Sequence, residues 1–144
     1  MTTVVATNEV MASDSKITME SKTDSRSYTA SKILVKNGDL LGTAGTVDYC
    51  ERFIDWYGTK KKKPHFPKEA DFEGLVLTKE GKLIHYDETL ARNVVRDPFF
   101  AIGSGSHAAL AALHLGCDAV RAVEIACLVD PFSGPPVQIG RAHV

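Results

Sequence analysis

The apolar, β-branched segments of this 144-residue chain come in pairs joined by short turns, and this pairing is what most constrains the fold. The first pair covers residues 2–6 and 10–13, with Asn8 and Glu9 in a tight turn between them. Further strands are predicted at residues 33–35, 40–42, 72–78, 82–86, 99–102 and 137–139. Strands joined by such short turns run antiparallel, because a parallel connection needs about a dozen residues or more. The sequence therefore predicts antiparallel sheets.

Helical patterns are grouped rather than alternating with single strands. Apolar residues recur at helical spacing along residues 47–57, and Gly58 is suited to end that helix. An alanine-rich helix is predicted at residues 108–115, and another at residues 119–129 begins after the N-cap residue Asp118. Paired strands and grouped helices indicate an α+β fold in which two antiparallel sheets lie between helix layers.

Two polar segments separate these elements. Residues 15–31 predict a long loop with some extended structure, and loops of that length are often functional. Residues 59–71 predict a basic, proline-containing connector that includes the lysine run Lys60–Lys63. Nucleic-acid binding is one interpretation of that run, but a solvated loop is favoured because the formal net charge is only −1.

The composition excludes several classes of protein. Hydrophobic residues make up 44% and charged residues 24%, which is typical of a globular chain, and the length suits a single domain over residues 1–144. We expect no nucleic-acid or membrane partner, since the net charge is near zero and no apolar run is long enough to span a bilayer. Three cysteines without a CxxC pair favour a reducing, cytoplasmic location. The histidines show no ligand spacing, so neither a metal nor a cofactor is expected.

The second residue, Thr2, offers a catalytic chemistry of its own. A methionine followed by a small residue is normally removed, which would leave Thr2 as the N-terminus. A free N-terminal threonine carries both a nucleophilic hydroxyl and a base, its own α-amine. The reference pKa of such an amine is about 7.7–8.0, close to a working pH. Many proteins begin with Met-Thr, so this feature alone is weak.

Five segments, in order, resemble the proteasome β-subunit family and its HslV-type peptidases in particular. They are TTVVAT with VMASD at the start, SKI at residues 31–33, LLGTAGTVD at 40–48, FFAIGSGS at 99–106 and DPFSG at 130–134. Together they span nearly the whole chain. The resemblance implies a four-layer αββα sandwich of the N-terminal-nucleophile (Ntn) hydrolase type, reduced in size. It also implies a threonine-type endopeptidase, a hydrolase that acts on polypeptides.

The resemblance assigns roles to three of these residues. Thr2 is expected to be the nucleophile, Lys32 the cation that lowers the pKa of the nucleophile, and Asp14 the acid that orients Lys32. A lysine beside an N-terminal amine disfavours the charged form of that amine and leaves more of it free to act as a base. Without the resemblance, a solvated lysine and a turn acid would be the simpler interpretation.

The resemblance extends to the surroundings of Thr2. Gly42 matches the glycine whose backbone N–H points at the oxyanion, and Gly45 is the alternative if the register is shifted. Ser104 matches the serine beside the N-terminal threonine, although it could also serve as a helix N-cap. Asp130 and Ser133 match the acid and the serine that hold the threonine amine.

The same resemblance implies self-assembly. Family members form a closed ring, so we expect about six or seven copies, in one ring or in two stacked rings. The expected contacts are aromatic residues of the first helix, such as Trp56 and Tyr57, and the smooth alanine-rich helix; core packing is the other interpretation of those aromatics. A second long helix that family members carry toward an ATP-dependent unfoldase is replaced here by residues 59–71. An unfoldase partner is therefore left open.

Two other functions remain compatible with the sequence. One is an inactive Ntn-fold scaffold or assembly protein, which the short length and the missing helix favour. The other is an Ntn amidase that acts on a small molecule. Residues 139–144 resemble translated sequencing-adapter sequence, so we expect the natural C-terminus to differ from this one.

Overall fold

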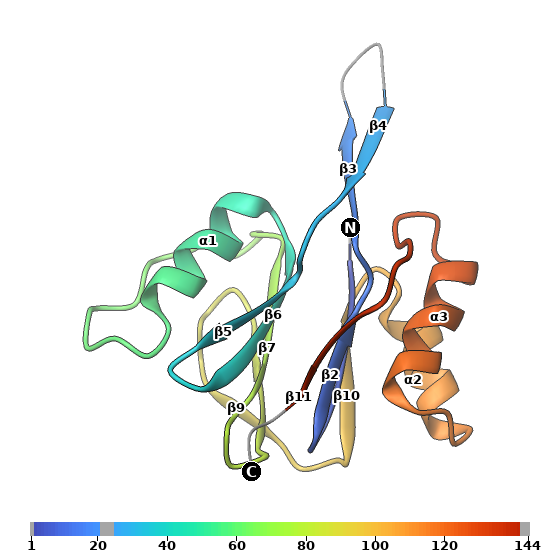
Figure 1. The fold of residues 1–144 in the computed structure, drawn as a ribbon. Helices are drawn as coiled ribbons and strands as arrows, with labels where there is room; N and C mark the ends of the chain where they lie inside the picture. Colours follow the sequence, from blue (N-terminus) through green and yellow to red (C-terminus); the bar gives the residue numbers. More distant parts are fainter. Residues whose placement is uncertain (1, 21–24, 142–144) are drawn as a thin grey trace.

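The computed structural model describes residues 2–20 and 25–141, and within them two main sheets pack face to face (Figure 1). The first sheet has the order β10-β1-β2-β11 and the second the order β5-β6-β7-β8-β9. The strands of the first sheet are β1 (Thr3–Thr7), β2 (Val10–Ser13), β10 (Phe99–Gly103) and β11 (Gln138–Arg141). Those of the second are β5 (Ile33–Lys36), β6 (Asp39–Gly45), β7 (Phe72–Leu77), β8 (Leu83–Tyr86) and β9 (Asn93–Val95). All neighbouring strands in both sheets are antiparallel.

Helices cover the outer face of each sheet. Helix α1 (Val47–Trp56) packs on β6 and β7, whereas α2 (Ser106–His114) and α3 (Ala119–Val129) pack on β1, β2 and β10 (Figure 1). The layers therefore follow the order helix, sheet, sheet, helix. This confirms the α+β, four-layer αββα fold predicted from the sequence.

Strand β1 shows how the layers are held together. Val4 and Ala6 face the space between the sheets, while Val5 faces the alanine-rich cluster under α2 and α3. Successive side chains of a strand point to opposite faces, so a strand that is covered on both faces is apolar at nearly every position. All three side chains are fully buried, which fixes the start of the chain inside the sandwich.

The contacts between α1 and the second sheet are made mainly by aromatic side chains. Phe53 lies at its centre with no exposed surface, and its ring contacts the rings of Trp56, Tyr57, Phe72 and Tyr86 at centroid distances of 5.0–6.2 Å. Phe53 and Tyr57 are therefore core residues, as the packing interpretation expects, whereas Tyr49 and Trp56 are half-buried. The assembly contact expected for these aromatic residues stays a prediction.

Local signals in the sequence explain several boundaries. Asn37 and Gly38 both have positive φ, at 54° and 83°, as the tight turn between β5 and β6 requires. The Asp118 side chain accepts a hydrogen bond from the backbone N–H of Arg121 at 2.8 Å and begins α3. No helix of the described residues is long and apolar enough to cross a membrane.

The sequence did not define three of the strands. Residues 15–31, predicted as a long loop with some extended structure, contain the hairpin of β3 (Lys16–Glu20) and β4 (Ser25–Thr29), which projects from the sandwich (Figure 1). Its strands form a separate two-stranded sheet. Ile17 and Met19 do alternate with polar residues in β3, but β4 has Tyr28 as its one large apolar residue, so the polar composition of the segment hid the strand pattern. The short edge strand β9 was also not predicted.

Candidate active site

Three residues from separate strand ends meet at one edge of the sandwich. Thr2 precedes β1, Asp14 follows β2, and Lys32 precedes β5. The Lys32 Nζ lies 3.1 Å from the Thr2 Oγ1 and 2.9 Å from the Asp14 Oδ1. The pairing of β1 with β2 brings Asp14 beside the start of β1, where its backbone N–H donates to the carbonyl of Thr3 at 3.1 Å. The structure thus brings together the three residues that the sequence suggested.

The Asp14 carboxylate is held by a complete set of donors. Besides Lys32, it accepts hydrogen bonds from the backbone N–H groups of Thr3 at 3.0 Å, Lys16 at 3.2 Å and Gly134 at 3.1 Å. Asp14 has no exposed surface, and a buried charge is tolerated only when it is paired and hydrogen-bonded in this way. Its position is therefore fixed by the backbone as well as by the ion pair.

Lys32 is buried with its partners and points its ammonium at the Thr2 hydroxyl. The Lys32 Nζ also donates to the carbonyl oxygen of Lys16 at 2.5 Å. Burial lowers the pKa of Lys32 from its ordinary value, and the Asp14 charge opposes that shift only in part. A cation that is close to the hydroxyl in a buried setting stabilises the alkoxide form, which is the reactive form of a threonine side chain.

A second carboxylate, Asp130, organises the other side of Thr2. Its Oδ2 accepts hydrogen bonds from Ser104 Oγ at 2.5 Å and from Ser133 Oγ at 2.7 Å. Ser104 Oγ also lies 3.4 Å from the Thr2 carbonyl oxygen, and Ser133 Oγ lies 2.7 Å from Thr3 Oγ1. Burial alone would raise the pKa of Asp130, but hydrogen bonds from the two serine hydroxyls and the Phe132 backbone N–H, together with nearby positive charge, lower that pKa overall. The network therefore keeps a carboxylate charged close to the start of the chain.

A cavity of about 200 Å³ opens beside Thr2. Its lining residues are Thr2, Ala44, Gly45, Asp71, Glu73, Gly103 and Ser104. Gly42 does not belong to this lining: it lies in the middle of β6, where an added Cβ would meet Val4 Cγ1 at 2.5 Å. The structure places the alternative, Gly45, at the cavity instead, three residues further along the strand. A φ of 117°, and an Asp71 carbonyl that an added Cβ would clash with, explain why position 45 needs glycine.

Sequence reasoning missed two acidic residues of this cavity, Asp71 and Glu73. They lie at the start of β7, which carries a glutamate inside the otherwise apolar run Phe72–Leu77. A charged side chain at that place in an apolar strand was the available signal. No group of three or more His, Cys, Asp or Glu side chains within the described ranges could hold a metal ion.

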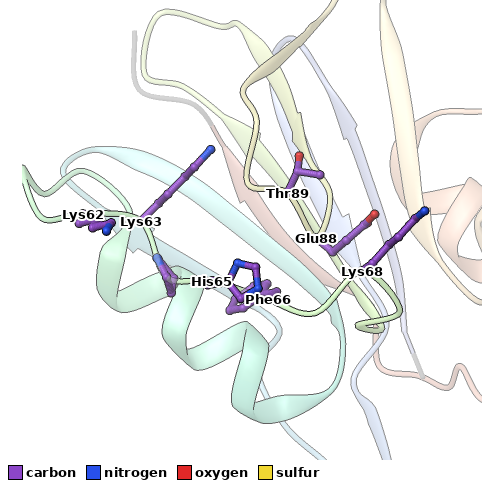
Figure 2. Close-up of a pocket in the computed structure, with 8 residues that line it drawn as sticks. Lys62, Lys63, His65, Phe66, Lys68, Glu88 and Thr89 are labelled. Carbon is purple, nitrogen blue, oxygen red and sulfur yellow. The ribbon is translucent and has the colours of Figure 1, made fainter.

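The lysine run lies at a different cavity. This hollow has a volume of about 530 Å³. Figure 2 shows side chains that line it, among them Lys62, Lys63 and Lys68 of the 59–71 connector, and Glu88 and Thr89. It shares no lining residue with the Thr2 cavity. All four lysines of the run are exposed, as expected of a solvated loop.

Comparison with solved structures places the fold, although no protein-family model and no curated protein matches the sequence. Eukaryotic HslV from Trypanosoma brucei aligns with a TM-score of 0.73 at 16% identity, over 99% of each chain. BPH from Thiobacillus denitrificans aligns with a TM-score of 0.71 at 17% identity, over 99% of this chain and 97% of BPH. BPH in complex with epoxomicin gives a TM-score of 0.70 at 17% identity, over 99% of each chain. The chain therefore has the HslV-type fold of the Ntn threonine peptidases.

Proposed function

We propose that this protein is an N-terminal threonine peptidase that cleaves peptide bonds through Thr2 once Met1 has been removed. The observation that carries the proposal is the contact of the Lys32 ammonium with the Thr2 hydroxyl, with Asp14 paired to that ammonium, although Lys32 and Asp14 lie 30 and 12 residues further along the chain. The HslV-type fold supports it, because that fold places the first residues of β1 at the edge of the sandwich. Met1 lies outside the described residues.

In the first step, the Thr2 hydroxyl attacks the carbonyl carbon of the substrate. The free α-amine of Thr2 accepts the hydroxyl proton, and Lys32 stabilises the developing alkoxide. The carbonyl oxygen becomes an oxyanion, for which the backbone N–H of Gly45 at the cavity wall is the proposed donor. When the intermediate collapses, the amide C–N bond breaks and the leaving amine takes the proton from the Thr2 ammonium.

In the second step, water hydrolyses the resulting ester. The α-amine of Thr2 accepts a proton from water, the hydroxide attacks the ester carbon, and the Thr2 oxygen leaves and is reprotonated. Asp130, Ser104 and Ser133 hold the start of the chain in place through both steps. Their role in this proposal is to position the amine, since none of them needs to gain or lose a proton.

We also propose that the protein assembles into a homo-oligomeric ring of about six or seven copies, in one ring or two stacked ones. Large apolar side chains at the ends of α2 and α3 support this. Leu115 is 86%, Leu128 80% and Val129 66% exposed. Enclosure inside a ring would keep an open threonine site away from cellular proteins. The proposed substrate is a polypeptide, and an ATP-dependent unfoldase is an optional partner of the ring.

Light scattering tests the assembly. We expect a mass several times 15.6 kDa without any partner. Leu128→Lys should lower that mass, whereas Val35→Lys, at a comparably exposed position on β5, should leave it unchanged. A wild-type monomer would contradict the ring and favour the amidase or scaffold alternatives.

Peptide cleavage by matched Thr2 variants tests the proposed activity. Thr2→Ala removes the attacking oxygen and should lower kcat/KM for a fluorogenic peptide by about 10⁴-fold or more. Thr2→Ser keeps a hydroxyl and an α-amine and should retain measurable turnover. Equal activity in wild type and Thr2→Ala would contradict the proposal, as would the absence of peptide cleavage by the assembled wild-type protein.

A further inference from the structure

We propose that the cavity beside Thr2 selects substrates with a cationic side chain next to the cleaved bond, with Glu73 and Asp71 as the selecting residues. This inference rests on the proposed peptidase function and names the substrate class of that same site. The cavity contains Thr2 itself, so a group bound there lies beside the attacking hydroxyl.

The charge of the cavity wall is one-sided. Among the residues that the structure describes, Asp71 and Glu73 are the two charged residues of the lining, which includes no lysine, arginine or histidine. Lys32, which is the cation on the other side of Thr2, is paired with Asp14 and does not belong to the lining. A positively charged side chain that enters the cavity therefore meets two carboxylates, whereas an acidic side chain is repelled.

The Glu73 side chain is held by hydrogen bonds but remains accessible to a substrate. Its Oε1 lies 3.5 Å from the backbone N–H of Gly103, and its Oε2 lies 3.0 Å from His85 Nε2. The Glu73 side chain is still 43% exposed, so a substrate cation can reach it without breaking these contacts. Asp71 is exposed, and its carboxylate makes no hydrogen bond or ion pair within the described part of the chain.

The size of the cavity fits one side chain. Its volume of about 200 Å³ is below the roughly 300–1,000 Å³ of pockets that hold a drug-sized ligand. A lysine or arginine side chain can extend its apolar stem along Ala44 and Gly103 and direct its charged end toward the carboxylates. Charge-assisted hydrogen bonds of this kind correspond to a preference of about tenfold to a hundredfold.

A different role for the same carboxylates predicts a different result. If Glu73 and Asp71 acted only on the Thr2 amine, their removal would change the cleavage of all peptides alike and would shift the pH profile of kcat. A selecting role changes the ratio between substrates, mainly through KM, and leaves the pH profile for a neutral peptide in place.

The experiment measures kcat/KM for three internally quenched peptides that differ only at the two residues that flank the cleaved bond. These residues are Lys in the first peptide, Leu in the second and Glu in the third. Wild type should prefer the Lys peptide over the Leu peptide by about tenfold or more, and cleave the Glu peptide least. Glu73→Gln and Asp71→Asn should each lower the Lys-to-Leu ratio several-fold. Glu80→Gln, an exposed acid in the turn after β7, is the matched control and should leave the ratio unchanged.

The outcomes separate this inference from the proposed function. Cleavage of the Leu peptide without a preference for Lys, or an unchanged ratio in Glu73→Gln and Asp71→Asn, would overturn the inference and leave the peptidase intact. Failure of wild type to cleave any of the peptides would overturn both.

Discussion

Lys32 and the lysine run Lys60–Lys63 are the same residue type in two very different environments. Lys32 is 8% exposed and its ammonium contacts the carboxylate of Asp14, the hydroxyl of Thr2 and a backbone carbonyl. The four lysines of the run are all exposed, and their ammonium groups make no hydrogen bond or ion pair within residues 2–20 and 25–141.

The difference shows that environment decides what a lysine does. In the run, water solvates each charge, and each side chain keeps its conformational freedom. At the edge of the sandwich, burial has lowered the pKa of Lys32, and the fixed partners leave one geometry for its charge. A functional lysine in this chain is therefore identified by its partners and its burial. The number of lysines in a segment says little about their function.

The largest expected difference is in activity. Lys32→Ala should lower kcat/KM by about 10⁴-fold, nearly as much as Thr2→Ala, because members of a catalytic unit are strongly non-additive. Lys61→Ala should change it less than about twofold, since exposed charges contribute little. Peptide cleavage is measured on protein that circular dichroism shows to be folded. Similar losses in both variants would remove the distinction between the two environments.

The next difference is in stability. Asp14→Ala should lower the free energy of unfolding by about 3–5 kcal/mol, because it leaves the buried ammonium of Lys32 and three backbone N–H groups without their acceptor. Lys32→Ala should lower the free energy of unfolding by a smaller amount, since those N–H groups still hold the Asp14 carboxylate. Urea unfolding at neutral pH measures both variants, and equal losses would show that the backbone donors do not matter.

The smallest effect concerns pH. The pKa of Asp130 in the folded protein lies below its ordinary value, so its carboxylate stabilises the fold above that ordinary value. This contribution disappears as the pH falls through the folded pKa. Asp130→Asn should therefore lower stability by on the order of 1–2 kcal/mol at neutral pH and have no effect in strong acid. A difference from wild type that is independent of pH would contradict this account.

The sequence predicted the fold where local signals agree with burial. The Asn37-Gly38 turn, the Asp118 cap and the continuous apolar run of β1 each specify an element by themselves. The hairpin of β3 and β4 was not predicted in this way, because its strands lie outside the main sheets and the short alternation of Ile17 and Met19 stands in a segment that is otherwise mostly polar.

The candidate site could be predicted only in part. Thr2, Asp14 and Lys32 were found because they flank strands and match family motifs, and the structure brings them together. The choice between Gly42 and Gly45 depends on where β6 meets the cavity, which no local pattern reveals. Glu73 reaches the same cavity from β7, a contact that only the pairing of β6 with β7 creates.

The central claim is that Thr2 acts as a free N-terminal nucleophile, and mass spectrometry of an active preparation tests it most directly. The protein is incubated with a peptide that ends in an electrophilic carbonyl group, and the intact mass and the N-terminal fragment are then measured. We predict that Met1 is absent and that the peptide adduct lies on Thr2, with no adduct in Thr2→Ala. An active preparation that retains Met1, or an adduct on any other residue, would contradict the account.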